Sequence, residues 1–133
     1  MNFKQQLQDE YTQRGIKELA NGLVEMCHGL SFESGWWEGL DPNNGLVQTN
    51  KLCLVHSEIS EAMEGFREDL MDDHLPHRKM AEVELADAVI RIADLAGAMG
   101  YDLGGAIVEK LAYNQNRADH KLENRSDENG KKF

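Results

Sequence analysis

Two stretches in the middle of the chain carry apolar residues at helical spacing. In residues 46–70 the apolar positions recur after 3, 4, 4, 3 and 4 residues, which places them on one face of a helix. These positions are Leu52, Val55, Ile59, Met63, Phe66 and Leu70. A second run, residues 78–99, is mostly apolar and stops before Gly100, a residue suited to ending a helix. The pattern therefore predicts two long helices in sequence.

Similar but weaker periodicity predicts a helix over residues 3–30 and another over residues 103–119. Residues 29–45, GLSFESGWWEGLDPNNG, hold four glycines, a proline and two asparagines, and we expect a loop there. No segment alternates as a strand does. We therefore expect an all-α, four-helix bundle with two long antiparallel helices at its centre, forming a single domain over residues 1–120, and a flexible basic tail over residues 121–133.

Composition narrows the classes of partner. The chain has 133 residues, and its 14 Lys and Arg against 24 Asp and Glu give a net charge of −10, which disfavours a binder of nucleic acid polymers or anionic membranes. No run approaches the roughly 18 apolar residues of a membrane span, and the first residues are too polar for a secretory signal. Because Cys27 and Cys53 match no metal-binding spacing, we expect free thiols and a cytoplasmic protein.

Carboxylates follow a regular pattern on the two central helices. Glu58 and Glu61 form E-x-x-E, and Glu84 and Asp87 form E-x-x-D. Residues three apart lie one above the other on a helix, so each helix presents two carboxylates together. If these four groups converge between the helices, their repulsion requires a cation, and their hard oxygen ligands favour Mg²⁺, with Mn²⁺ as a substitute.

The second of these helices is polar along one narrow stripe only. From Val83 to Met99 nearly every residue is apolar except Glu84, Asp87, Arg91 and Asp94. This composition predicts a largely buried helix with its acids on one seam. The alternative is a solvated seam in which Arg91 pairs with Asp87 and Asp94.

Taken together, the motifs resemble those of the MazG-type all-α nucleoside triphosphate pyrophosphohydrolases. That family combines E-x-x-E and E-x-x-D, separated here by residues 62–83, with a later Lys-x-x-x-Asn-x-x-Arg and a closing Gly-Lys pair. The later motif corresponds to Lys110, Asn114 and Arg117, and the closing pair to Gly130 and Lys131. The resemblance covers about residues 46–133.

The resemblance implies a hydrolase that cleaves a (d)NTP between its α and β phosphates, giving a (d)NMP and pyrophosphate. It implies Mg²⁺ bound by Glu58, Glu61, Glu84 and Asp87, with Glu61 or Glu58 as the general base on a water. It also implies a homodimer or homotetramer that acts on the nucleotide pool.

Further residues are candidates for binding the nucleotide. Trp37, beside Trp36 in the loop, offers an aromatic face to a base, and Lys51 precedes Glu58 by about two helical turns. His28 lies just before the same loop. The remaining candidates, taken from the family motifs and the tail, are Lys110, Asn114, Arg117 and Lys131.

Two other functions remain open at this point. One is a non-catalytic helical module that regulates a partner through its acidic face. The other is a related hydrolase that acts on a different nucleotide, such as an alarmone.

Overall fold

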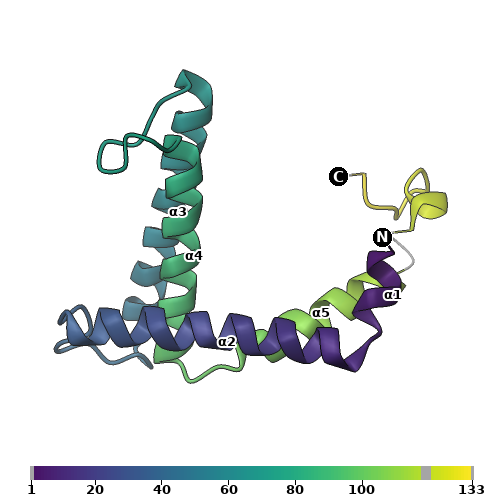
Figure 1. The fold of residues 1–133 in the computed structure, drawn as a ribbon, viewed down its shortest axis with the longest axis horizontal. Coiled ribbons are helices and arrows are strands. Elements are labelled where there is room, and N and C mark those ends of the chain that lie inside the picture. Colours follow the sequence, from purple (N-terminus) through teal and green to yellow (C-terminus); the bar gives the residue numbers. More distant parts are fainter. Residues whose placement is uncertain (1, 118–120, 133) are drawn as a thin grey trace. The chain divides into compact units, whose positions relative to one another are not determined.

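The chain is predominantly helical in the part that the computed structural model describes, residues 2–117 and 121–132 (Figure 1). Helices account for most of these residues, and a single isolated bridge, between Met71 and Lys79, is the only β pairing among them. The predicted all-α class is confirmed. The elements are α1 (Phe3–Leu7), α2 (Glu10–Glu33), α3 (Gly45–Glu68), α4 (Met80–Ala98), α5 (Leu103–Asn116) and a short 3₁₀ helix, η2 (Leu122–Asn124).

Two compact units make up the fold. One comprises the described residues of Met1–Gly22 and Asp102–Phe133, and the other comprises Leu23–Tyr101. The second unit contains α3, α4, the last turns of α2 and the tryptophan loop, so it holds both carboxylate motifs. Among the described residues, no helix combines the length and the apolar character needed to cross a membrane.

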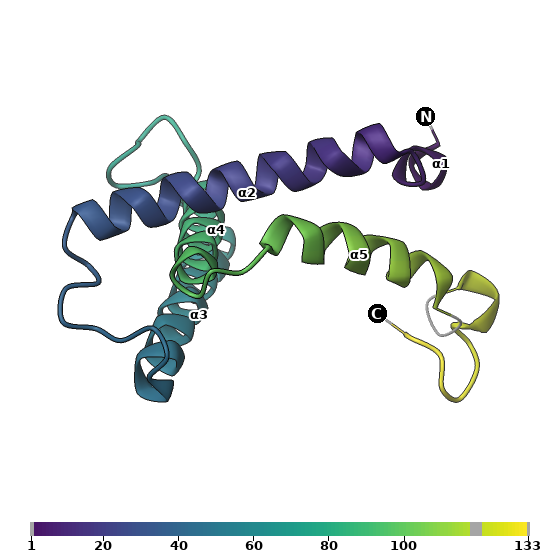
Figure 2. The same ribbon diagram turned by 90° about the horizontal axis from the view of Figure 1, so that it is seen from below.

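Small residues allow α3 and α4 to approach each other closely. Ala62, Ala81 and Ala88 are buried, and a Cβ added at Gly65 would lie 2.8 Å from the backbone nitrogen of Ala81. The end of α3 thus meets the start of α4. At the other end, the Gln48 side chain lies 3.8 Å from the Met99 sulfur, so the start of α3 meets the end of α4. Figures 1 and 2 both show the two helices side by side.

The end of α4 matches the sequence prediction. Gly100 has a φ of 68°, a left-handed conformation that favours glycine, directly after the C-cap residue Met99. The backbone N–H groups of Gly100 and Tyr101 donate to the carbonyls of Gly97 and Ala96, which is a Schellman motif. This closure satisfies the carbonyls of the last turn and fixes where α4 stops.

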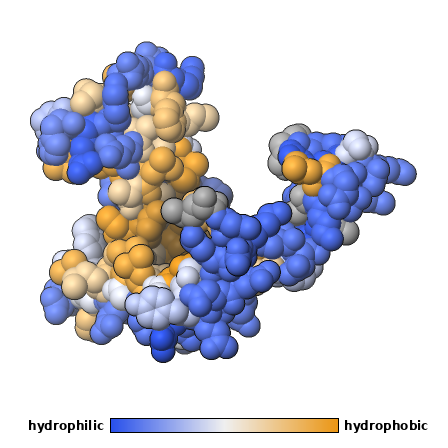
Figure 3. Space-filling view, turned by 45° about the vertical axis from the view of Figure 1, so that its right-hand side comes forward, coloured by the Kyte–Doolittle hydropathy of each residue, from blue (hydrophilic) through white to orange (hydrophobic). Residues whose placement is uncertain are grey.

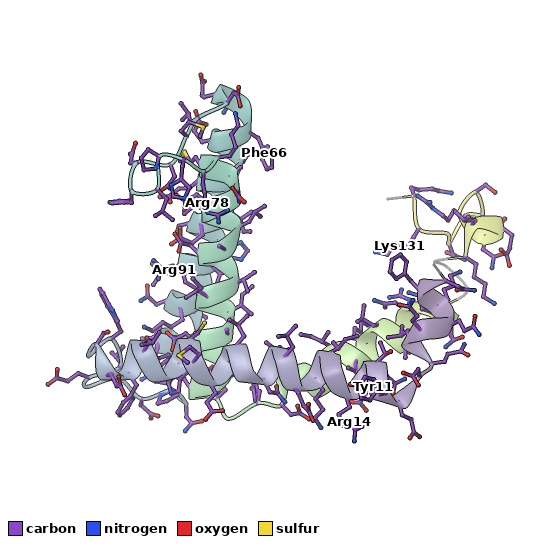
Figure 4. The ribbon with its side chains drawn as sticks, in the orientation of Figure 1. Tyr11, Arg14, Phe66, Arg78, Arg91 and Lys131 are labelled. Atoms are coloured by element: carbon purple, nitrogen blue, oxygen red, sulfur yellow. The ribbon has the colours of Figure 1, made fainter. Side chains whose placement is uncertain are left out.

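The α3–α4 pair has two different faces. On the face opposite the carboxylates, large apolar side chains remain exposed, and Phe66 is the most exposed of them at 70%. We call this surface the apolar face; it consists of Leu52, Ile59, Met63, Phe66, Leu85, Val89 and Ile92. Figure 3 shows hydrophobic surface along this pair, and Figure 4 places Phe66 and Arg91 on opposite sides of it. The prediction that the second central helix is largely buried is therefore wrong for the single chain.

The first predicted helix differs from the structure at both ends. It is interrupted at Gln8 and Asp9, because the Asp9 carboxylate accepts hydrogen bonds from the backbone N–H and hydroxyl of Thr12 (2.9 and 3.0 Å) and thereby caps a new helix, α2. These bonds also lower the pKa of Asp9. At the other end α2 continues to Glu33, past the predicted limit at Leu30, because contacts with α4 hold its last turn.

The predicted loop is shorter than expected, since residues 34–44 alone connect α2 to α3. The predicted helix over residues 103–119 begins at Leu103 and is described to Asn116, and its predicted end at Asp119 lies outside the described residues. In the predicted tail, η2 forms a turn, and Arg125 Nε donates to the Lys131 carbonyl oxygen at 3.1 Å.

Within the first unit, a polar clamp joins α2 to the start of α5. Asn21 donates to the Asp102 carboxylate (2.8 Å) and accepts from the backbone N–H of Gly104 (2.7 Å). Hydrogen bonds from Asn21 and Gly105, together with Lys17, lower the pKa of Asp102 to about 2. A Cβ at Gly104 would collide with the carbonyl of Lys17, so this contact depends on glycine. The clamp positions α5, which carries Lys110 and Asn114.

Candidate metal centre

Three of the four predicted carboxylates converge between α3 and α4. One carboxylate oxygen from each of Glu58, Glu84 and Asp87 lies within 4.8 Å of the other two. We call these three residues the acidic cluster. Glu58 and Glu84 are buried, and Asp87 is partly buried. Glu61, the fourth predicted ligand, is exposed at the edge of the cluster.

The acidic cluster holds more negative charge than its surroundings neutralise. Burial, hydrogen bonding with Glu58 and the nearby charge of Glu61 raise the pKa of Glu84 from its ordinary 4.5 to about 8. Glu84 thus keeps its proton at neutral pH, because a third carboxylate charge at this point is too costly. Burial and the charge of Glu58 also raise the pKa of Asp87.

Arg91 is the basic side chain that contacts the acidic cluster. Its Nε donates to Glu58 Oε1 at 2.6 Å, across from α4 to α3. Burial opposes ionisation of Glu58, but the hydrogen bonds from Arg91 and Glu84 outweigh burial and lower its pKa. The ion pair therefore joins two helices, and the alternative in which Arg91 pairs with Asp87 and Asp94 along its own helix is not what the structure shows.

The donor set of the acidic cluster fits Mg²⁺. All its ligand atoms are carboxylate oxygens, which are the hard ligands that Mg²⁺ prefers. Burial is the largest cause of the raised pKa values of Glu84 and Asp87, and the neighbouring carboxylate charges add to it. Metal binding would replace the proton that Glu84 otherwise retains.

A cavity of about 580 Å³ opens beside the acidic cluster. Its wall combines acidic, basic, hydroxyl and aromatic groups, all from the second unit. The lining residues are Cys27, Leu30, Ser31, Ser34, Trp36, Lys51, Leu54, Glu58, Asp87, Ile90, Arg91 and Asp94. The volume falls in the range of pockets that hold small-molecule ligands.

The two tryptophans of the loop have different positions. Trp36 is 69% exposed and lines the cavity, whereas Trp37 is buried behind it. The Lys51 ammonium lies 4.4 Å from the centre of the Trp37 ring and 3.5 Å from the Trp36 carbonyl oxygen. Lys51 therefore holds the loop against α3 as well as lining the cavity. His28 contacts Trp37 edge-on, with ring centres 5.8 Å apart, and does not belong to the lining.

Asp94 is a residue of the site that the sequence did not single out as functional. Its Oδ1 accepts from His28 Nδ1 (2.8 Å) and Trp37 Nε1 (2.9 Å), and its Oδ2 accepts from Ser31 Oγ (2.8 Å). These bonds attach the end of α2 and the tryptophan loop to α4. The available signal was the spacing: Asp94 follows Asp87 by seven residues, which is two helical turns on the same face.

The family-motif residues of α5 belong to the first unit. Lys110 and Arg117 lie over the Tyr113 ring, 4.7 and 5.8 Å from its centre. The side-chain oxygen of Asn114 is buried and has no hydrogen-bond partner among the described residues. Lys131 accepts from Arg125 through its backbone carbonyl. Their predicted role in binding a nucleotide stays a prediction.

Comparison of the chain with known protein families, with curated proteins and with solved structures found no match.

Proposed function

We propose that the protein is a Mg²⁺-dependent pyrophosphohydrolase of the MazG type that converts a (d)NTP to a (d)NMP and pyrophosphate. The observation that carries the proposal is the convergence of Glu58, Glu84 and Asp87, of which Glu58 and Asp87 line a cavity of about 580 Å³. In this proposal α3 and α4 are the antiparallel central helices of a MazG-like fold. The order and spacing of the carboxylate motifs and of Lys110, Asn114 and Arg117 support it.

The residues of the second unit have complementary roles in the proposed reaction. Glu58, Glu84 and Asp87 hold the metal, which when bound neutralises phosphate charge and makes a coordinated water more acidic. Glu61, exposed beside Glu84, is free of an ion pair to Arg91 and takes the water proton as general base. Arg91 and Lys51 offer positive charge to the phosphates, and Trp36 offers its ring to the base.

The proposal is tested by incubating the purified protein with each dNTP and NTP and measuring pyrophosphate release. We expect release from at least one nucleotide with Mg²⁺ or Mn²⁺, and none in EDTA. Hydrolysis of an alarmone but of no triphosphate would retain the proposed hydrolase activity and assign it a different substrate. No hydrolysis of any nucleotide would contradict the proposal and favour a non-catalytic interaction module.

The proposed enzyme acts as an assembly of two or four copies, with the apolar face covered by a second copy. None of the larger side chains described is fully buried within the chain, and the apolar face extends over both α3 and α4. A contiguous exposed surface of this kind is typical of an interface. Both cysteines are free, as the proposed cytoplasmic location requires.

Light scattering during size-exclusion chromatography tests the assembly. We expect a mass at least twice the 15.0 kDa of one chain, and a shift toward 15.0 kDa for Phe66→Glu, which places a charge on the apolar face. Lys4→Glu, an exposed change in the first unit, is the control and is expected to leave the mass unchanged. A wild-type protein with the mass of one chain would contradict the assembly.

A further inference from the structure

Helix α4 lines the cavity over about two helical turns. Asp87, Arg91 and Asp94 all line it, and their spacing of four and three residues places them on one helix face. Asp87 belongs to the acidic cluster, and Asp94 lies seven residues further along, about 10 Å at the helical rise. A nucleotide bound along this face with its phosphates at the acidic cluster would extend its sugar and base toward Asp94.

Asp94 acts as a hydrogen-bond acceptor toward the cavity. The indole N–H of Trp37 can only donate, so the Asp94 oxygen that it contacts accepts. The same oxygen lies 2.8 Å from His28 Nδ1. A carboxylate offers about four lone-pair directions, and His28, Trp37 and Ser31 occupy three. The carboxylate also lines the cavity, so acceptor capacity remains for a ligand.

The surrounding contacts hold Asp94 in this role. A Cβ at Gly97 would collide with the His28 side chain, so His28 lies directly against the backbone of α4. Trp37 is 6% exposed and contacts the His28 ring edge-on. Donors fixed in this way keep the Asp94 side chain in one orientation. Beside it, the exposed ring of Trp36 forms part of the same wall.

We propose that Asp94 recognises the base of the substrate through an exocyclic amino group. The chemical class is a nucleotide with an amino group at the pyrimidine 4 or purine 6 position, as in cytosine and adenine, because an amino group donates to a carboxylate. Uracil, thymine and hypoxanthine present a carbonyl oxygen at that position, which a carboxylate repels. This inference rests on the proposed function and adds its substrate preference.

The direct test compares kcat/KM for dCTP and dUTP in the wild type and in Asp94→Asn. The two bases differ at position 4, an amino group against a carbonyl, and at N3, an acceptor in cytosine and an N–H donor in uracil. We expect the wild type to prefer dCTP by at least about tenfold, the effect of one charge-assisted hydrogen bond. Asp94→Asn removes the charge and adds an amide donor, so we expect the preference to disappear or reverse. dATP and dITP form the equivalent purine pair, with the same expected direction.

Glu82→Gln is the matched control, since Glu82 is an exposed carboxylate of α4 that pairs with Arg78 outside the cavity. It is expected to keep the wild-type ratio. Equal use of dCTP and dUTP by the wild type, which needs no variant to fold, would overturn the inference and leave the proposed function intact. An equal loss of kcat/KM for both nucleotides in Asp94→Asn would assign Asp94 a structural role and would also overturn the inference. Release of pyrophosphate from neither nucleotide would overturn the inference, and the proposed function would fail with it only if no other dNTP or NTP were hydrolysed.

Discussion

Replacing Glu84 with Gln, or Asp87 with Asn, is expected to lower the rate of pyrophosphate release by at least about 100-fold. Removal of residues that only support a metal ligand costs about 10–100-fold, and removal of a ligand itself costs more. Each change keeps the size of the side chain and takes one oxygen donor out of the acidic cluster. The measurement is the steady-state rate at saturating nucleotide and a fixed Mg²⁺ concentration.

Glu82→Gln again provides the control, because it replaces a carboxylate by an amide in the same helix at an exposed position, with 55% of the side chain accessible. We expect it to retain wild-type activity. Thermal unfolding of each variant separates a loss of the site from a loss of the fold. Activity near the wild-type level in both Glu84→Gln and Asp87→Asn would exclude the acidic cluster as the metal centre.

Without metal, the protein is expected to lose stability as the pH rises from about 4.5 to about 8. The pKa of Glu84 is about 8 in the folded protein and near 4.5 when the chain is unfolded. Below pH 4.5 Glu84 is protonated in both states and its contribution is fully present. Between these values only the unfolded state releases the proton, so the free energy of unfolding falls as the pH rises.

The measurement is the unfolding midpoint in EDTA from pH 5 to pH 8.5. The net charge of −10 adds a general decline with pH, so the informative quantity is the difference between the wild type and Glu84→Gln. We expect a shallower decline in Glu84→Gln and greater stability than the wild type at pH 8. Saturating Mg²⁺ should reduce the decline in the wild type. Identical slopes for the two proteins in EDTA would show that Glu84 does not retain its proton on folding.

Local sequence patterns were sufficient to predict the elements that carry the acidic cluster. Apolar residues at spacings of three and four predict α3 and α4 within two residues at each end, and Gly100 ends α4 as its conformational freedom suggests. The i, i+3 spacing of the carboxylates was enough to predict that each helix presents two of them together, but not that Glu58, Glu84 and Asp87 meet without Glu61. These features depend on contacts within one helix or between neighbours in sequence.

Other features depend on contacts that the sequence does not encode locally. The extension of α2 to Glu33 depends on hydrogen bonds from His28 and Ser31 to Asp94, more than 60 residues away. Trp37 is buried and donates a hydrogen bond to Asp94 as well, whereas Trp36 is exposed. The break before α2 was missed for a different reason, since the apolar pattern does not show that Asp9 leaves the helix and accepts a hydrogen bond from the backbone N–H of Thr12.

Binding of the metal itself, without any nucleotide, tests the central claim most directly. Electron paramagnetic resonance counts free Mn²⁺ during a titration of the protein, and Mg²⁺ is then added as a competitor. We predict at least one Mn²⁺ per chain that Mg²⁺ displaces, and binding at least about tenfold weaker in Asp87→Asn but unchanged in Glu82→Gln. Equal Mn²⁺ binding by the wild type and Asp87→Asn would contradict a metal centre at Glu58, Glu84 and Asp87.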